Sequence, residues 1–239
     1  MLHFVSDLHL SPHSPGATRL FLDYLAGRAQ QARSLYILGD LFETWIGDDD
    51  DDPFQREIVG ALKAVSDAGL GILIQHGNRD FLLGEGFAAS SGCRLLSDPY
   101  VLSLPSWQFV LTHGDALCTD DAEYMSFRHQ VRSPEWQAAF LAKPLAERRA
   151  IAAYLRNRSE MNKQEKTAAL MDVNPQETDD FIRQHGYATL IHGHTHRPAT
   201  HDHFVDGIHV ERWVLSDWHE DRGEFLAWDG DTLQRRLLT

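Results

Sequence analysis

The chain has 239 residues, of which 43% are hydrophobic, and this length and composition fit one compact domain with a sizeable core. Its 22 basic and 35 acidic residues give a net charge of −13, which repels phosphate backbones and excludes a general nucleic-acid-binding module. The two cysteines, Cys93 and Cys118, are too few for a disulfide framework and favour a reducing compartment.

The first half of the chain alternates short β-rich segments with helical patterns. We expect strands at Leu2–Val5, Ser34–Leu38 and Gly71–Gln75, with helices over residues 18–32 and 54–68 between them. This βαβαβ order predicts parallel strands with helices packed against them, and therefore an α/β fold.

The second half begins with a predicted β-hairpin, whose strands span residues 101–104 and 108–111. The spacing is then helical to about Asn174, a strand resumes over residues 188–192, and the tail is β-rich. We therefore expect a single domain over residues 1–239, with a helical lid over residues 119–180 inserted into it.

The N-terminal segment shows no targeting signal. It enters a strand pattern directly and lacks the basic segment and apolar run of a signal peptide. No apolar run approaches the length of a membrane span. We expect a soluble, cytoplasmic protein, and the sequence leaves peripheral contact with a membrane open.

Side chains that bind metal ions follow five of the expected strands. They are Asp7 and His9, then Asp40, Asn78, His113, and finally His194 with His196. In open α/β sheets ligands bind beyond the carboxyl ends of the strands, so these segments should converge there. Imidazole and carboxylate groups suit Mn²⁺, Fe²⁺ or Zn²⁺. A single Asp or His at a strand end is usually a cap or a loop residue, but five such segments favour a metal site.

The motifs are Asp7-x-His9, Gly39-Asp40, Gly77-Asn78, His113 and Gly193-His194-x-His196. Their pattern resembles the signature of the calcineurin-like metallophosphoesterases, DxH…GD…GNH[DE]…H…GHxH. The resemblance implies an αββα sandwich and two divalent metal ions. Arg79 departs from the pattern, because the family has a proton-donating His there. Arginine does not release its proton near neutral pH, so we expect Arg79 to stabilise phosphate charge.

Longer segments resemble one branch of that family, the UDP-2,3-diacylglucosamine hydrolases. They span residues 4–11, 38–50, 77–84, 113–121, 158–163 and 171–175. This resemblance implies hydrolysis of the pyrophosphate of UDP-2,3-diacylglucosamine to UMP and 2,3-diacylglucosamine 1-phosphate, in lipid A biosynthesis. It also implies a peripheral protein on the cytoplasmic face of the inner membrane, and we expect a monomer.

The resemblance assigns roles to individual residues. It implies one metal ion at Asp7, His9, Asp40 and His196, a second at Asp40, Asn78, His113 and His194, and manganese as the metal. Asp40 would bridge the two ions, and Asp40, His113 and Arg79 would take part in catalysis. Substrate contacts are implied for Asn78, Arg79, Asp121, Ser159, Lys163, Lys166 and His194. Two such ions activate a shared water, so we expect a bridging hydroxide to attack the α-phosphorus.

The expected insertion is basic between residues 143 and 166, with seven basic and three acidic residues. Ser159, Lys163 and Lys166 have helical spacing and would share one face. Such a strip could steer a phosphorylated substrate, although a solvated helix face explains the same charges. For the acidic run at residues 48–52 we expect a solvated loop.

Other side chains have less certain roles from sequence. Trp45, Phe81 and Leu83 are candidates for an acyl pocket or for the core. Asp80 and Asp115 could orient neighbouring groups.

Two rival functions share the metal motifs. One is another two-metal phosphodiesterase or nucleotide-sugar pyrophosphatase, which would not explain Arg79 or the basic helices. The other is a non-catalytic scaffold of the same fold, which would be expected to lose metal ligands, whereas every one is present here.

Overall fold

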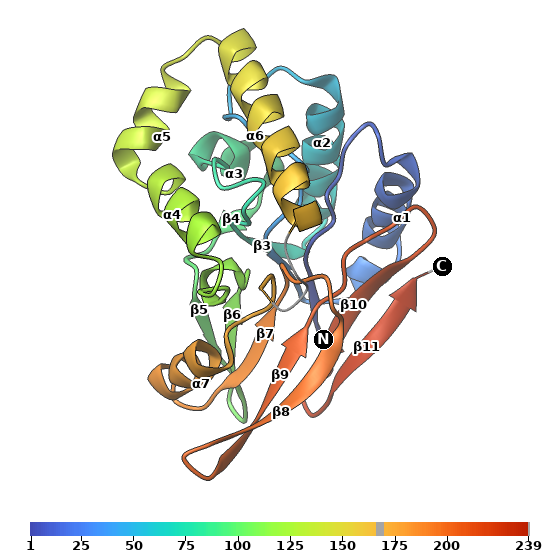
Figure 1. Cartoon of the computed structure of the whole chain (residues 1–239). Helices are drawn as coiled ribbons and strands as arrows, with labels where there is room; N and C mark the ends of the chain where they lie inside the picture. The colour runs from blue at the N-terminus through green and yellow to red at the C-terminus, as the bar shows by residue number, and fades with distance from the viewer. Residues whose placement is uncertain (166–169, 239) are drawn as a thin grey trace.

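The computed structural model describes residues 1–165 and 170–238. Two β-sheets pack face to face, and helices cover the outer face of each (Figure 1). The fold is therefore the αββα sandwich that the sequence predicts.

The first sheet has the order β11-β10-β1-β2-β3-β4. Its strands are β1 (Leu2–Val5), β2 (Ser34–Leu38), β3 (Gly71–Gln75), β4 (Arg94–Leu95), β10 (Gly223–Trp228) and β11 (Leu233–Leu238). Strands β1 to β4 are parallel, whereas β10 and β11 are antiparallel to their neighbours. The three expected strands of the first half are confirmed at the expected bounds.

The second sheet has the order β5-β6-β7-β9-β8. Its strands are β5 (Tyr100–Ser103), β6 (Gln108–Thr112), β7 (Thr189–His192), β8 (Ala199–Val205) and β9 (Ile208–Val214). Strands β6, β7 and β9 are parallel, and β5 and β8 form antiparallel edges. The hairpin and the β-rich tail that the sequence predicts are both present.

Alternating side chains explain how the layers hold together. On β1, Phe4 packs between the two sheets, whereas Val5 packs under the helices of the first sheet. On β7, Ile191 enters the space between the sheets and Leu190 packs on the outer helical side. Because both faces of these strands are buried, consecutive residues such as Phe4-Val5 and Leu190-Ile191 are apolar.

Helices α1 (Pro15–Ala26), α2 (Pro53–Asp67) and α3 (Glu85–Ser91) cover the first sheet. Helix α2 starts where expected, because Asp52 accepts hydrogen bonds from the backbone N–H groups of Phe54 and Gln55. The prediction of a single helix over residues 18–32 is wrong in extent. The observed helix α1 begins at Pro15 and ends before Gly27, and a 3-10 helix, η1 (Arg28–Gln31), follows it.

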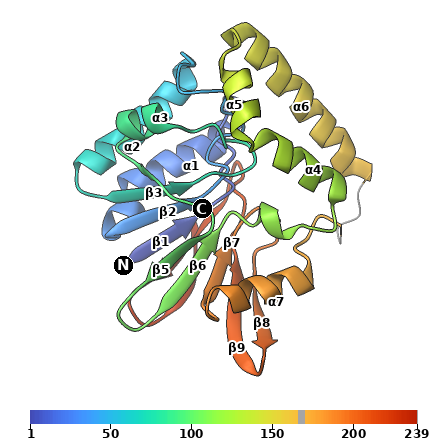
Figure 2. The ribbon, with the colours of Figure 1, turned by 90° about the vertical axis from the view of Figure 1, so that its left-hand side faces the viewer.

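The helices of the second half form two groups. Helices α4 (Ala122–Val131), α5 (Pro134–Leu141) and α6 (Leu145–Glu165) stand beyond the carboxyl ends of the strands (Figure 2). Helix α7 (Pro175–Gln184) instead packs against the outer face of the second sheet, where Ile182 joins the apolar cluster with Leu190. The range expected for the insertion, 119–180, therefore includes most of a helix that belongs to the sandwich.

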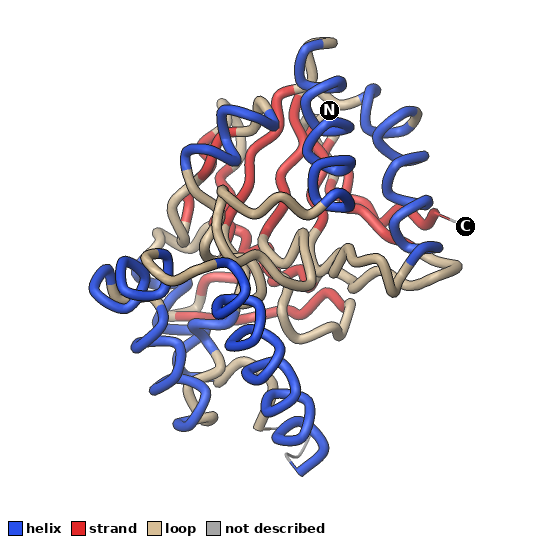
Figure 3. Tube along the Cα trace, turned by 90° about the horizontal axis from the view of Figure 1, so that it is seen from above, coloured by secondary structure: helices blue, strands red, loops and turns tan. Residues whose placement is uncertain are grey.

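The loops after β1, β2, β3, β6 and β7 gather at one end of the sandwich. Viewed from above, loops occupy the centre of the molecule, with helices around them (Figure 3). A short 3-10 helix, η2 (Asp115–Leu117), follows β6 at this end. These loops carry the candidate metal-ligating residues.

Candidate metal centre and active site

The motif loops have an unusual backbone shape. Residues with a left-handed backbone include Asp7, His9, Asp40, His194 and His196, with φ between 48° and 67°. This conformation is uncommon outside glycine, and such strain concentrates at functional sites. The tertiary structure therefore holds these five side chains in positions that the isolated loops would not favour.

Asp7, His9 and His196 form the first group of ligand atoms, all within 4.8 Å of one another. The Nε2 atoms of His9 and His196 are 3.2 Å apart, and Nε2 of His196 lies 3.3 Å from Oδ1 of Asp7. Oδ2 of Asp7 accepts hydrogen bonds from Ser6 and from the backbone N–H of His194, whereas the buried Oδ1 has no hydrogen-bond donor. A buried carboxylate oxygen without a donor, facing two imidazoles, fits a cation.

The second group lies around Asn78. Its Oδ1 is 3.0 Å from Nε2 of His113 and 2.8 Å from Nδ1 of His194. His113 also groups with Asp7 and Asp40, each offering an atom within 4.8 Å of the others. An amide oxygen, two imidazoles and a carboxylate thus converge on one small volume.

Asp40 faces both groups. Its Oδ2 lies 3.7 Å from Nε2 of His9, and its Oδ1 lies 3.8 Å from Nε2 of His113. The backbone N–H of Arg79 donates to Oδ1 at 2.8 Å, which fixes the carboxylate. Gly77 is required beside it, since a Cβ there would lie 2.0 Å from Oδ1. This placement suits a carboxylate that is shared between two ions.

The structure thus brings together all seven residues for which the sequence predicts metal binding. Every donor is nitrogen or oxygen, and both cysteines are buried and have no ligand atom in these groups. Such a set fits Mn²⁺, Fe²⁺ or Zn²⁺.

In three of the candidate ligand imidazoles, Nδ1, the ring nitrogen that points away from the ligand groups, faces an oxygen. Nδ1 of His9 lies 2.9 Å from Glu43, Nδ1 of His196 lies 3.3 Å from Asp217, and Nδ1 of His113 donates to the carbonyl of Leu38 at 2.8 Å. An oxygen at Nδ1 keeps the proton there, so that Nε2 is left to bind a metal ion. The sequence prediction missed Glu43 and Asp217. Glu43 follows the same strand as Asp40, which could have indicated it, but no motif points to Asp217.

Charge in the site perturbs two of the imidazoles in opposite directions. Burial lowers the pKa of His113, but the charges of Asp40, Asp7 and Asp115 outweigh burial and raise this pKa to about 9. Burial and the charge of His113 lower the pKa of His194 to about 3. His194 is therefore ready to act as a neutral ligand, whereas His113 must lose a proton first.

Asp80 and Asp115 brace the site, in agreement with the orienting role expected for them. The buried Asp80 carboxylate accepts from the backbone N–H groups of Asp40, Leu41, Phe42 and Gly77, which ties the loop after β2 to the loop after β3. Burial and the charge of Asp40 raise the pKa of Asp80.

Asp115 attaches α4 to the sandwich. Its carboxylate accepts hydrogen bonds from Nε of Arg128 and from the hydroxyl of Tyr124, both at 2.8 Å, and pairs with Arg132 at 3.5 Å. The Tyr124 ring in turn stacks on His194, with 5.7 Å between the ring centroids. This network places α4 beside the second ligand group.

The residues expected to contact substrate lie at the metal groups and on the helices above them. Asn78, Arg79 and His194 belong to the motif loops, and Asp121 caps α4 by accepting from the backbone N–H of Tyr124. Ser159 lies on α6, half-buried. The expectations for the Lys163 side chain and for Lys166 lie outside the described residues.

The acidic run at residues 48–52 is exposed at Asp48, Asp49 and Asp51, as expected of a solvated loop, but it also forms ion pairs with α6. Asp49 pairs with the buried Arg148 of α6, whose Nη1 also donates to the carbonyl of Ile46 at 2.8 Å. Asp50 and Asp51 pair with Arg149 of the same helix. The run therefore fastens α6 to the sandwich, and part of the basic strip expected for steering is neutralised in doing so.

Two of the three apolar candidates for an acyl pocket are core residues. Trp45 and Leu83 are buried in the cluster under the helices of the first sheet. Phe81 is partly buried and lies beside Trp136 of α5, with Arg132 over its ring. Tyr154 and Met161 of α6 are 64% and 61% exposed.

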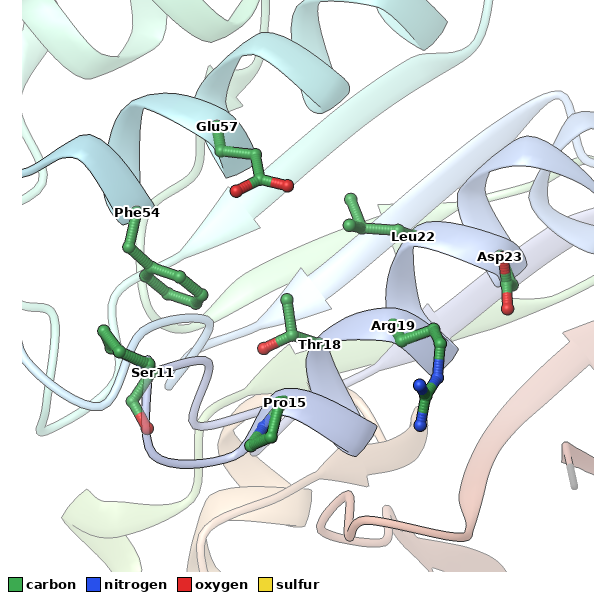
Figure 4. Close-up of a pocket in the computed structure, with 9 residues that line it drawn as sticks. Ser11, Pro15, Thr18, Arg19, Leu22, Asp23, Phe54 and Glu57 are labelled. Atoms are coloured by element: carbon green, nitrogen blue, oxygen red, sulfur yellow. The ribbon is translucent and has the colours of Figure 1, made fainter.

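A cavity of about 350 Å³ lies between α1 and α2, away from the predicted ligands. Phe54 and Glu57 of α2 face Thr18 and Leu22 of α1 across it (Figure 4). Its lining includes none of the candidate site residues, so we assign it no part in the site.

A family model described as calcineurin-like phosphoesterase matches residues 2–198. The chain therefore belongs to the calcineurin-like phosphoesterase family, as its motifs predict, and it is an enzyme of the hydrolase class. The scaffold alternative is set aside by this result. In the described part of the chain, no helix combines the length and hydrophobicity that crossing a membrane requires.

Individual relatives match nearly the whole chain. A protein named UDP-2,3-diacylglucosamine hydrolase from Aromatoleum aromaticum is 51% identical over 227 residues, covering 95% of this chain and 92% of the relative. One of the same name from Chromobacterium violaceum is 50% identical over 229 residues, covering 95% and 94%. Among solved structures, the phosphoesterase Yfce from E. coli is 16% identical with a TM-score of 0.47, covering 100% of this chain and 99% of that chain.

Proposed function

We propose that this chain hydrolyses the pyrophosphate of UDP-2,3-diacylglucosamine, giving UMP and 2,3-diacylglucosamine 1-phosphate. The observation that carries the proposal is the pair of adjacent ligand groups with Asp40 between them, 3.7 Å from His9 and 3.8 Å from His113. The names of relatives that are about half identical over nearly the whole chain support the substrate.

The proposed centre holds two divalent ions, with manganese as the metal. Asp7, His9, Asp40 and His196 would hold one ion, and Asp40, Asn78, His113 and His194 the other. Two such ions, when bound, activate water and stabilise the charge that develops on the attacking and leaving oxygens. The donor types support this assignment but fit iron and zinc as well.

The chain's own residues position the substrate and balance its charge. The guanidinium of Arg79 offers N–H donors and a fixed positive charge to the phosphoryl oxygens, without acting as an acid. The amide of Asn78 and the ring of His194, whose Oδ1 and Nδ1 atoms are 2.8 Å apart, would contact the same phosphoryl oxygens. We assign further substrate contacts to Asp121, Ser159, Lys163 and Lys166. Of these, Asp121 and Ser159 would approach the nucleotide sugar from the side of α4 and α6.

We propose that α4, α5 and α6 act as a lid for the lipid part of the substrate. Leu141 ends α5 and Tyr154 and Met161 lie on α6, all three exposed, and α6 also carries basic side chains such as Arg158. Apolar and basic groups on one helical segment favour peripheral contact with an anionic membrane. The protein would act as a monomer on the cytoplasmic face of the inner membrane.

The test is UMP release from UDP-2,3-diacylglucosamine with Mn²⁺, compared with a deacylated UDP-sugar and a generic phosphodiester. Lipid-selective release supports the proposal, whereas equal turnover of all three substrates supports a broad phosphodiesterase. In ¹⁸O-water, attack at the α-phosphorus places the label in UMP. Label in the lipid phosphate would reject this site of attack.

A further inference from the structure

Glu43 lies between the ligand groups and the lid helix α6. Its Oε2 is 2.9 Å from Nδ1 of His9, and its Oε1 is 3.3 Å from Arg156 of α6 and 3.7 Å from Arg79. The Glu43 side chain is 13% exposed, so solvent screens these contacts only weakly. One carboxylate thus contacts a candidate metal ligand with one oxygen and two arginines with the other.

The contact at Nδ1 sets the direction of the His9 ring. The opposite nitrogen, Nε2, faces His196 at 3.2 Å and Asp40 at 3.7 Å. An oxygen beside Nδ1 keeps the proton on that nitrogen and directs the lone pair of Nε2 into the ligand group. Removing this oxygen would leave both the tautomer and the orientation of His9 unspecified.

The contact with Arg156 links the same carboxylate to the position of α6. The Asp49–Arg148 pair and the Arg149 pairs also attach α6 to the sandwich, but Asp49, Asp50 and Asp51 contact none of the seven candidate ligands. The Glu43–Arg156 pair, in contrast, leads from α6 to a candidate metal ligand, His9, in one step.

We propose that Glu43 is a positioning residue that couples the seating of α6 to the orientation of His9, and through His9 to metal binding. The proposal rests on the metal site proposed above and not on the identity of the substrate. With α6 seated, Arg156 and Arg79 hold Oε1, and Oε2 stays beside His9. When α6 moves away, Oε1 loses Arg156 and keeps the longer contact with Arg79, so Oε2 is held less firmly beside His9. Coupling of this kind is reciprocal, so metal binding also stabilises the seated α6.

The chain offers a matched control for each half of this coupling. Asp217 supports His196 as Glu43 supports His9, but its other side-chain contacts are His219 and Arg222, outside the lid. Arg149 attaches α6 to Asp50 and Asp51 and contacts no candidate ligand. Asp217→Asn therefore removes the support of a candidate metal ligand without touching α6, and Arg149→Met removes a contact of α6 without touching a candidate ligand.

The experiment measures two quantities in the full chain. Mn²⁺ affinity is followed by electron paramagnetic resonance of the free ion, and the seating of α6 by hydrogen–deuterium exchange over residues 145–158. Glu43→Gln is expected to weaken Mn²⁺ binding about 10- to 100-fold and to speed exchange in α6. Asp217→Asn weakens Mn²⁺ binding, with exchange in α6 of the metal-free protein unchanged. Arg149→Met speeds exchange but leaves the Glu43–Arg156 contact in place, so it should weaken Mn²⁺ binding much less than Glu43→Gln does.

Several results would overturn the coupling. One is a Glu43→Gln protein that changes in only one of the two quantities, and another is an Arg149→Met protein whose Mn²⁺ binding weakens as much. If Glu43→Gln fails to fold by circular dichroism, Arg156→Met decides, because that side chain is 37% exposed. It should weaken Mn²⁺ binding roughly 3- to 10-fold, and unchanged affinity rejects the coupling. A wild-type chain that binds no Mn²⁺ would reject the proposed metal site as well.

Discussion

Asp80→Asn tests how much the motif loops depend on one buried carboxylate. Asp80 is fully buried, and its two oxygens accept from four backbone N–H groups, at distances of 2.8–3.4 Å. The asparagine amide keeps one acceptor oxygen and turns an NH₂ group toward one pair of donors. Each donor left unsatisfied costs about 1–3 kcal/mol. The raised pKa of Asp80 indicates that burial of its charge already offsets part of the stability that its hydrogen bonds contribute. We therefore expect a loss of about 2–4 kcal/mol in the free energy of unfolding.

The assay is urea unfolding of the metal-free protein, followed by circular dichroism. With a denaturant dependence of about 2–3 kcal/mol/M, the midpoint should fall by roughly 1 M. Asp67→Asn is the matched control, because Asp67 is 64% exposed and pairs with Lys63 on the surface of α2, so its cost should stay below about 0.5 kcal/mol. Equal midpoints for the two variants would refute the reasoning. Because Asp80 also positions the backbone of Asp40, we expect weaker Mn²⁺ binding in Asp80→Asn alone.

Three further predictions concern protonation, charge and thiol reactivity. The pKa values of His113 and His196 are raised to about 9 and about 10, so both rings are protonated and positively charged at pH 7.5. Mn²⁺ binding should therefore release up to about two protons, and Mn²⁺ affinity should fall as the pH falls. Calorimetry in buffers of different ionisation enthalpy measures this release, and a value of zero contradicts it. Arg79→Met should lower kcat by about 100-fold or more with Mn²⁺ affinity nearly unchanged; a variant with normal turnover would remove Arg79 from the proposed chemistry. Burial raises the pKa of Cys93 to about 11 and that of Cys118 to about 12, so a thiol reagent at pH 8 should label both only after unfolding, and labelling of the native protein would contradict their burial.

The sequence predicts those parts of the molecule that depend on local pattern. The parallel strands are visible because burial on both faces leaves continuous apolar runs, such as Leu35 to Leu38 on β2. The convergence of Asp7, Asp40 and His194 follows from the rule that ligands gather at the carboxyl ends of strands. Both arguments need only the order of residues along the chain.

What the sequence does not show depends on partners far away in the chain. The sequence does not show that Asp49 pairs with Arg148, and Asp217 carries no motif although it supports His196. Helix α3 and the two-residue strand β4 are too short to give a clear periodic signal. Helix α7 shows the same helical spacing in its sequence as the lid helices. Its packing against the second sheet, which the sequence does not show, assigns it to the sandwich.

The candidate ligands are divided between the two sheets of the sandwich. Asp7, Asp40 and Asn78 follow strands of the first sheet, whereas His113, His194 and His196 follow strands of the second. A metal ion held by both sets would cross-link the two layers at one end. Sliding of one sheet over the other by an ångström or two would break the coordination, so the loaded centre would oppose any separation of the layers. Metal loading should therefore make unfolding of the two halves of the sandwich a single event, with a melting temperature that rises with the concentration of free metal.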